Sequence, residues 1–235
     1  MALKLLLFGD SITFGKGVPS GRGWSTLLRE YAEPQDPYNY IYNLGIPGDT
    51  STHLLERFST EANARYKTNR PENTYAIVIA IGINDTRALV QGEPETSFAQ
   101  FTGNIQTLIS QAQDITEHLF FIGLTRVDET LTQPWEDTYF DNETIEKYEK
   151  EIQRLCQENS VPFLDVEWEK ENYKELLADG LHPNEKGYQF IFEKVKKFLE
   201  DNEIIRFLEI GLPVYCIDMV GDSWAVDELK DLAIV

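Results

Sequence analysis

Three residues in this sequence have the types and settings that suit nucleophilic catalysis. Ser11 ends the tripeptide Gly-Asp-Ser at residues 9–11, directly after an apolar run, and Asp179 lies three residues before His182 in a loop that contains glycine and proline. A serine hydroxyl becomes a good nucleophile when a base removes its proton. A histidine serves as that base when a carboxylate fixes its tautomer and orientation. The spacing therefore predicts Ser11 as nucleophile, His182 as base and Asp179 as the acid that orients the imidazole.

Two further segments suit the stabilisation of a developing negative charge. Gly48 lies in a turn that also contains a proline, where a backbone N–H can point outward without a Cβ in the way. Asn84, in Gly-Ile-Asn-Asp at residues 82–85, can direct its amide into a cleft. Together with the backbone N–H of Ser11, these groups form a candidate oxyanion hole. Taken singly, each segment is more typical of an ordinary turn or helix cap.

The elements that would position these residues follow from hydrophobic periodicity. Short apolar runs alternate with longer segments that have apolar residues at helical spacing, which is typical of a parallel sheet covered by helices on both faces. We expect strands at residues 3–8, 38–43, 75–81, 119–124 and 161–166. We expect helices at residues 24–32, 50–66, 98–112, 143–159 and 184–199.

Right-handed crossovers place the carboxyl ends of parallel strands along one edge, where such sheets bind ligands. Ser11, Gly48 and Asn84 all follow predicted strands, and the pair Asp179 and His182 precedes the last predicted helix. Their convergence at one edge makes the combined signal much stronger than any single motif.

The ordered set of motifs resembles the SGNH hydrolases, also called GDSL esterases and lipases. The resemblance covers roughly residues 3–200, and its one departure is Ile12, where the family name has leucine. It implies a three-layer, flavodoxin-like α/β fold with a central five-stranded parallel sheet and helices on both faces. It also implies that the nucleophile is Ser11, the oxyanion donors are Ser11, Gly48 and Asn84, and the Asp-x-x-His pair is Asp179 and His182. The expected reaction is hydrolysis of a small carboxylic ester through an acyl-enzyme, without a cofactor.

Charge and composition exclude several classes of function. The chain has 235 residues, 42% of them hydrophobic, and a formal net charge of −19. Such a surface repels phosphate backbones and anionic bilayers, so we expect neither nucleic-acid binding nor stable membrane insertion. The apolar start at residues 1–8 is too short for a membrane span and lacks the features of a signal peptide, which favours a cytoplasmic protein. Cys156 and Cys216 both stand in apolar settings and suggest no disulfide framework, and no metal site has suitable spacing.

Two regions depart from the alternation. Residues 126–142 form a long acidic and aromatic loop, either a lid or wall of the site or a packed surface loop. We expect a catalytic domain at residues 1–203 and a C-terminal extension at 204–235. The extension contains a strand-like run at 214–220 and a second Gly-Asp-Ser at 221–223 that we interpret as a chance match. Its apolar character suggests a homodimer contact.

Rival interpretations remain at this stage. An acyltransferase would use the same residues with an alcohol in place of water as acceptor. A relative that had lost activity would be a binding domain on the same fold. A flavodoxin-like or receiver-like switch would share the sheet but would not need Asp179, His182 and Asn84 together.

Overall fold

The short apolar runs form one parallel sheet. The computed structural model describes residues 2–66, 70, 72–89, 94–168 and 172–206, and all statements below concern that part of the chain. The strands are β1 (Leu3–Gly9), β2 (Tyr40–Gly45), β3 (Thr74–Ala80), β5 (His118–Ile122) and β7 (Phe163–Leu164), in the order β2-β1-β3-β5-β7. All four neighbouring pairs are parallel. The five-stranded parallel sheet and its flavodoxin-like strand order confirm the predicted fold.

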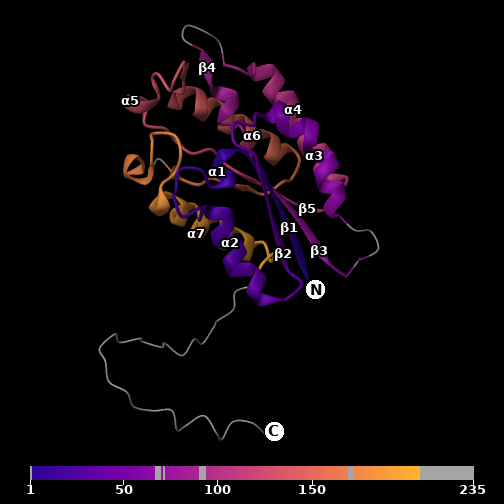
Figure 1. Ribbon diagram of the computed structural model, residues 1–235. Helices are drawn as coiled ribbons and strands as arrows, with labels where there is room; N and C mark the ends of the chain where they lie inside the picture. The colour runs from indigo at the N-terminus through magenta and orange to yellow at the C-terminus, as the bar shows by residue number, and fades with distance from the viewer. Residues whose placement is uncertain (1, 67–69, 71, 90–93, 169–171, 207–235) are drawn as a thin grey trace, which may run out of the picture.

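Helices at the expected positions connect the strands. The long ones are α2 (Trp24–Ala32), α3 (Ser51–Arg65), α4 (Phe98–Gln113), α6 (Asn142–Glu158) and α7 (Glu185–Asp201). A short α1 (Ser11–Phe14) follows β1 directly. Figure 1 shows α3, α4 and α6 on one side of the strands and α2 and α7 on the other. None of the helices that the structure describes is long and apolar enough to cross a bilayer.

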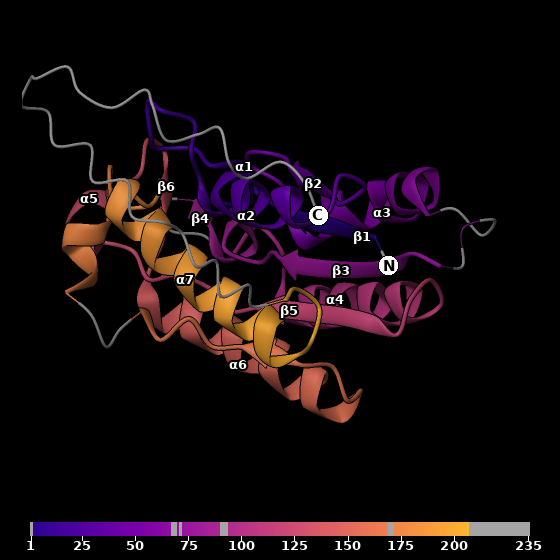
Figure 2. The same cartoon turned by 90° about the horizontal axis from the view of Figure 1, so that it is seen from below.

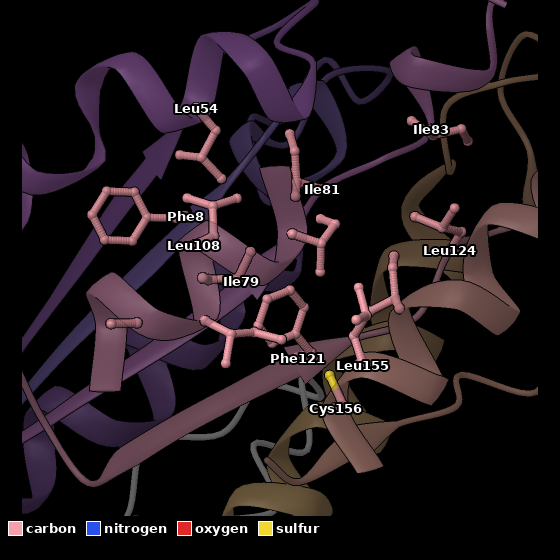
Figure 3. Close-up of a cluster of buried hydrophobic side chains, with 14 of the residues drawn as sticks. Phe8, Leu54, Ile79, Ile81, Ile83, Leu108, Phe121, Leu124, Leu155 and Cys156 are labelled. Atoms are coloured by element: carbon pink, nitrogen blue, oxygen red, sulfur yellow. The ribbon is translucent and has the colours of Figure 1, made fainter. Parts of the chain in front are cut away.

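Alternating side chains of the strands supply two separate cores. Leu6 and Phe8 of β1 point into a cluster with α3, α4 and α6, whereas Leu5 and Leu7 point into a cluster with α2 and α7. This is the period-2 alternation of a strand that is buried on both faces. Figure 3 shows part of the first cluster, in which Phe8 and Phe121 of the sheet meet Leu54 and Leu108 of the helices. Cys156 is a free, buried member of this cluster, as its apolar setting suggested, and burial raises the pKa of its thiol to about 12.

Two predicted segments differ from the structure. The strand expected at residues 161–166 is reduced to the two residues of β7, because Pro162 has no N–H to donate and a turn with Glu167 at a φ of +56° follows. The segment 126–142 is only partly a loop. It contains α5 (Glu129–Thr132) and β6 (Thr138–Tyr139), which pairs antiparallel with β4 (Ala88–Leu89). Val127 and Phe140 are buried in the first core, so the segment is anchored near both of its ends.

The last part of the chain is described only as far as Arg206. Ile204 and Ile205 follow α7 and are buried in the second core. The expectations for Cys216, the run at 214–220, the second Gly-Asp-Ser and a dimer contact lie outside the described residues.

The register of the sheet brings the chemistry-bearing loops together. Gly9, at the end of β1, pairs with Gly45 of β2 on one side and with Ala80 of β3 on the other. The three strands therefore end level with one another, and the loops that follow them start from the same edge. In Figure 2 the arrow of β3 points toward this edge, where α5, β4 and β6 are also found.

Candidate active site

Ser11 is presented by a tight turn between β1 and α1. Asp10 caps α1 by accepting a hydrogen bond from the N–H of Ile12 at 2.9 Å, and Ser11 is the first residue of the helix. Gly9 must be a glycine, because a Cβ there would lie 2.5 Å from the carbonyl oxygen of Ala80. The hydroxyl of Ser25 in α2 donates to the carbonyl of Thr13 at 2.7 Å, which links α1 to α2. The nucleophile candidate therefore stands on a fixed support.

The imidazole of His182 lies between Ser11 and Asp179. Its Nε2 is 3.0 Å from Ser11 Oγ, and its Nδ1 is 2.8 Å from Asp179 Oδ2. Ser11 and His182 are 5% and 3% exposed, so little water competes for their hydrogen bond. The other carboxylate oxygen, Asp179 Oδ1, accepts the backbone N–H groups of Leu181 at 3.1 Å and His182 at 2.7 Å. The structure thus brings the three predicted residues together in the order serine, histidine, aspartate.

The environment keeps Asp179 ionised. Partial burial raises the pKa of this carboxyl, but the hydrogen bond from the His182 side chain and those from the backbone N–H groups outweigh that effect. The net result is a pKa below the ordinary aspartate value. A charged Asp179 accepts the Nδ1–H of His182 and leaves Nε2 free to accept a proton from Ser11.

The two predicted oxyanion donors lie on the neighbouring loops of the same edge. Gly48 is exposed, has a φ of +86°, and has no atom within 4 Å of where a Cβ would stand, so its backbone is open on that side. Asn84 begins the short helix η2 (Asn84–Thr86) after β3 and is 5% exposed. Its Nδ2 donates to the backbone carbonyl of Asp49 at 2.9 Å. Because an amide nitrogen carries two N–H donors, a second one remains to point away from Asp49.

Buried carboxyls lie behind these loops. Burial, reinforced by the charges of Asp85 and Asp49, raises the pKa of Asp10 to about 7. Burial also raises the pKa of Asp85 to about 6, although hydrogen bonds from Ser51 oppose that rise. Asp85 accepts from the backbone N–H of Ser51 at 2.8 Å and from its hydroxyl at 2.5 Å. It therefore fastens the start of α3 to the loop that carries Asn84.

The segment 126–142 forms a wall beside the histidine. The ring of Trp135 meets the His182 ring edge-on, with 5.9 Å between centroids. The backbone N–H of Asp128 donates to the carbonyl of Gly180 at 2.8 Å, which links the segment to the loop that carries Asp179 and His182. Of the two alternatives left open by the sequence, these contacts favour a wall of the site over a packed surface loop.

Arg57 was missed at the level of sequence. Arg57 connects the ends of two loops, and its position seven residues after Thr50 on one helix face was the signal that could have revealed it. His53 belongs to the capping box of α3 with Thr50. His118 starts β5, away from the site-bearing edge. In the residues that the structure describes, no cluster of three histidine, cysteine or acidic side chains could hold a metal ion.

Comparisons with known proteins point to one family. The model of the GDSL-like lipase/acylhydrolase family matches residues 7–190. The isoamyl acetate-hydrolysing esterase of Saccharomyces cerevisiae is 28% identical over 219 residues, which cover 84% of this chain and 86% of the yeast protein.

Solved structures share the fold. The lipase/acylhydrolase from Enterococcus faecalis superposes with a TM-score of 0.68 at 22% identity, over 86% of this chain and 97% of that one. A variant of an acetyl xylan esterase from Geobacillus stearothermophilus gives a TM-score of 0.63 at 18% identity, over 83% and 93% of the two chains.

Proposed function

Because the chain belongs to the GDSL-like lipase/acylhydrolase family and is an esterase of that family, we propose that it cleaves small carboxylic esters through an acyl-enzyme on Ser11. The observation that carries this proposal is the unbroken hydrogen-bonded chain from Ser11 Oγ through His182 to Asp179. It has the nucleophile, the base and the orienting acid in contact before any substrate binds.

The first half of the reaction forms the acyl-enzyme. Ser11 Oγ attacks the ester carbonyl carbon while Nε2 of His182 takes the hydroxyl proton. Asp179 stabilises the imidazolium that results. The tetrahedral intermediate collapses as His182 passes the same proton to the alkoxide oxygen, and the alcohol leaves. In the second half, water gives a proton to His182 as it attacks the acyl carbon. His182 then returns this proton to Ser11 Oγ as the bond from Oγ to the acyl carbon breaks and the carboxylic acid leaves.

Negative charge on the former carbonyl oxygen would be held by three donors. These are the backbone N–H groups of Ser11 and Gly48 and the side-chain amide of Asn84. The openness of the backbone at Gly48 and the fixed orientation of the Asn84 amide support these roles. Donors that need no reorganisation when charge develops are the most effective ones.

For the substrate we propose an acetate or similarly short ester of an apolar alcohol. Three large apolar side chains are exposed around this edge: Phe14 of α1, Ile46 of the loop after β2, and Leu131 of α5. Phe14 ends the helix that starts with Ser11, and Leu131 lies against Gly180 of the histidine loop. Such a rim suits an apolar leaving group, and the yeast relative is named for its action on isoamyl acetate.

A labelling experiment and a substrate series test this proposal together. A fluorophosphonate should label the wild type on Ser11 and leave Ser11→Ala unlabelled, and Ser11→Ala should lose ester turnover. Isoamyl acetate should be cleaved faster than acetylated xylan. Normal turnover by Ser11→Ala would contradict the mechanism, and a preference for the polysaccharide would contradict the substrate class alone.

The rival activities give different results in the same assays. An acyltransferase would yield a new ester when a second alcohol is supplied, whereas a hydrolase yields mainly the free acid. An inactive binding domain would leave the fluorophosphonate unreacted.

A further inference from the structure

Arg57 on α3 reaches the two loops that flank the nucleophile. Its Nε donates to Asp49 Oδ2 at 2.8 Å, and one terminal nitrogen donates to the carbonyl of Gly9 at 3.1 Å. The other terminal nitrogen donates to Glu61 at 3.0 Å, one turn along the same helix. Gly9 is two residues before Ser11, and Asp49 directly follows Gly48. A single guanidinium thus joins the turn of the nucleophile to the turn of an oxyanion donor.

Asp49 also contacts the third loop, which carries Asn84. While its side chain accepts from Arg57, its backbone carbonyl accepts from the amide of Asn84 at 2.9 Å. The same residue therefore contacts Arg57 on one side and a proposed oxyanion donor on the other. A displacement of Asp49 would move both the N–H of Gly48 and the amide of Asn84.

We propose that Arg57 and Asp49 are positioning residues that hold the Gly48 and Asn84 donors in place relative to Ser11. Neither residue is part of the triad or of the oxyanion hole, and the inference rests on the function proposed above. It assigns to the pair an effect on the transition state, where the donors act, rather than on the binding of the ester.

The chemistry of the two side chains fits this role. The Arg57 and Asp49 side chains are only 15% and 11% exposed, so water screens their ion pair weakly. A guanidinium offers five N–H donors in a rigid plane, which lets one side chain fix several acceptors in a defined geometry. A lysine ammonium is a point charge on a flexible chain. It could keep the ion pair with Asp49 but would hold Gly9 and Asp49 together less firmly.

The test is a set of steady-state measurements on a chromogenic acetate ester. We expect Arg57→Ala to lower kcat by roughly ten- to a hundredfold with little change in KM, since loss of an oxyanion donor itself costs about a hundredfold or more. Asp49→Asn should act in the same direction. Arg57→Lys should recover part of the lost kcat, because it restores the charge opposite Asp49.

Two variants control for simpler explanations. Arg154→Ala removes an arginine that also pairs with two glutamates, but only within α6, and should keep wild-type kcat. Phe58→Ala, on the same helix as Arg57, removes a core ring whose centroid lies 4.8 Å from the centroid of the Phe8 ring. It should lower stability but not the kcat of the folded fraction, which separates a positioning effect from general destabilisation.

A double-mutant cycle identifies the route of the effect. If Arg57 acts through the oxyanion donors, Arg57→Ala should cost clearly less in kcat once Asn84 is already alanine, because only the Gly48 donor is then left to be displaced. An equal loss in both backgrounds would overturn the inference. So would a wild-type kcat for Arg57→Ala, or a rise in KM alone. Ser11→Ala is measured alongside these variants: if it stays active, the proposed function fails, whereas its inactivity beside a fully active Arg57→Ala refutes only the positioning role.

Discussion

Replacement of Asp179 by asparagine should nearly abolish activity because it reverses the polarity of one hydrogen bond. In the structure, Asp179 Oδ1 accepts two backbone N–H groups, from Leu181 and His182. An asparagine must keep its oxygen at that position, since an amide NH₂ cannot accept. Its NH₂ then occupies the place of Oδ2, 2.8 Å from Nδ1 of His182.

Two donors cannot face each other, so Nδ1 of His182 must become an acceptor. The ring proton then moves to Nε2, 3.0 Å from Ser11 Oγ, where it blocks the acceptance of the serine proton. An imidazole held in the wrong tautomer costs about four orders of magnitude in kcat in serine proteases, or roughly 5.5 kcal/mol of transition-state stabilisation. We expect a loss of about that size for Asp179→Asn.

The comparison with Asp179→Ala makes the test specific. Alanine removes the orienting carboxylate but introduces no opposing donor, so His182 can still reach the productive tautomer. We therefore expect Asp179→Ala to be more active than Asp179→Asn, although alanine is the less conservative change. The assay is turnover of a chromogenic acetate ester, with circular dichroism to verify folding. If folded Asp179→Asn keeps more than about a tenth of wild-type kcat, or exceeds Asp179→Ala, the tautomer argument is refuted.

Three further predictions concern the oxyanion hole, the buried acid and the core. Asn84→Ala should lower kcat by about a hundred- to a thousandfold, roughly 3–4 kcal/mol, with KM nearly unchanged, and a near-normal kcat in steady-state assays would exclude it as a donor. Asp10→Asn should have a higher free energy of unfolding than the wild type, and this difference should grow as the pH increases. Both proteins are uncharged at this position below the ordinary pKa of 3.8, whereas above the folded-state pKa of about 7 only the wild type must bury a charge, at a cost of at most about 4 kcal/mol. Urea titrations at several pH values measure that difference, and a constant difference would contradict the burial argument. Phe58→Ala should cost about 3–5 kcal/mol of stability in the same titrations, because its ring is fully buried between α3 and the sheet, and a loss below about 1 kcal/mol would show that this core repacks.

Much of the fold could be predicted because its causes are local. The run at 75–81 is apolar on both faces, which is typical of a central parallel strand, and β3 occupies nearly the same residues. Helix α2 has the predicted bounds because its apolar stripe is bordered by glycine before and by a proline after. The strand at 161–166 was overestimated because apolar periodicity takes no account of the missing N–H of Pro162 or of the positive φ of Glu167, which limit its pairing with β5.

The same division holds for the site. The sequence by itself determined which residues carry reactive groups and that Ser11, Gly48 and Asn84 each follow a strand, because strand ends and tight turns are encoded locally. Only the tertiary structure decided that Nε2 of His182 lies 3.0 Å from a hydroxyl 171 residues away. It also decided that Trp135 stands beside that imidazole and that Arg57 joins two loops. These contacts depend on the order of the strands and the packing of the helices, because residues remote in the chain meet only when the whole sheet has assembled.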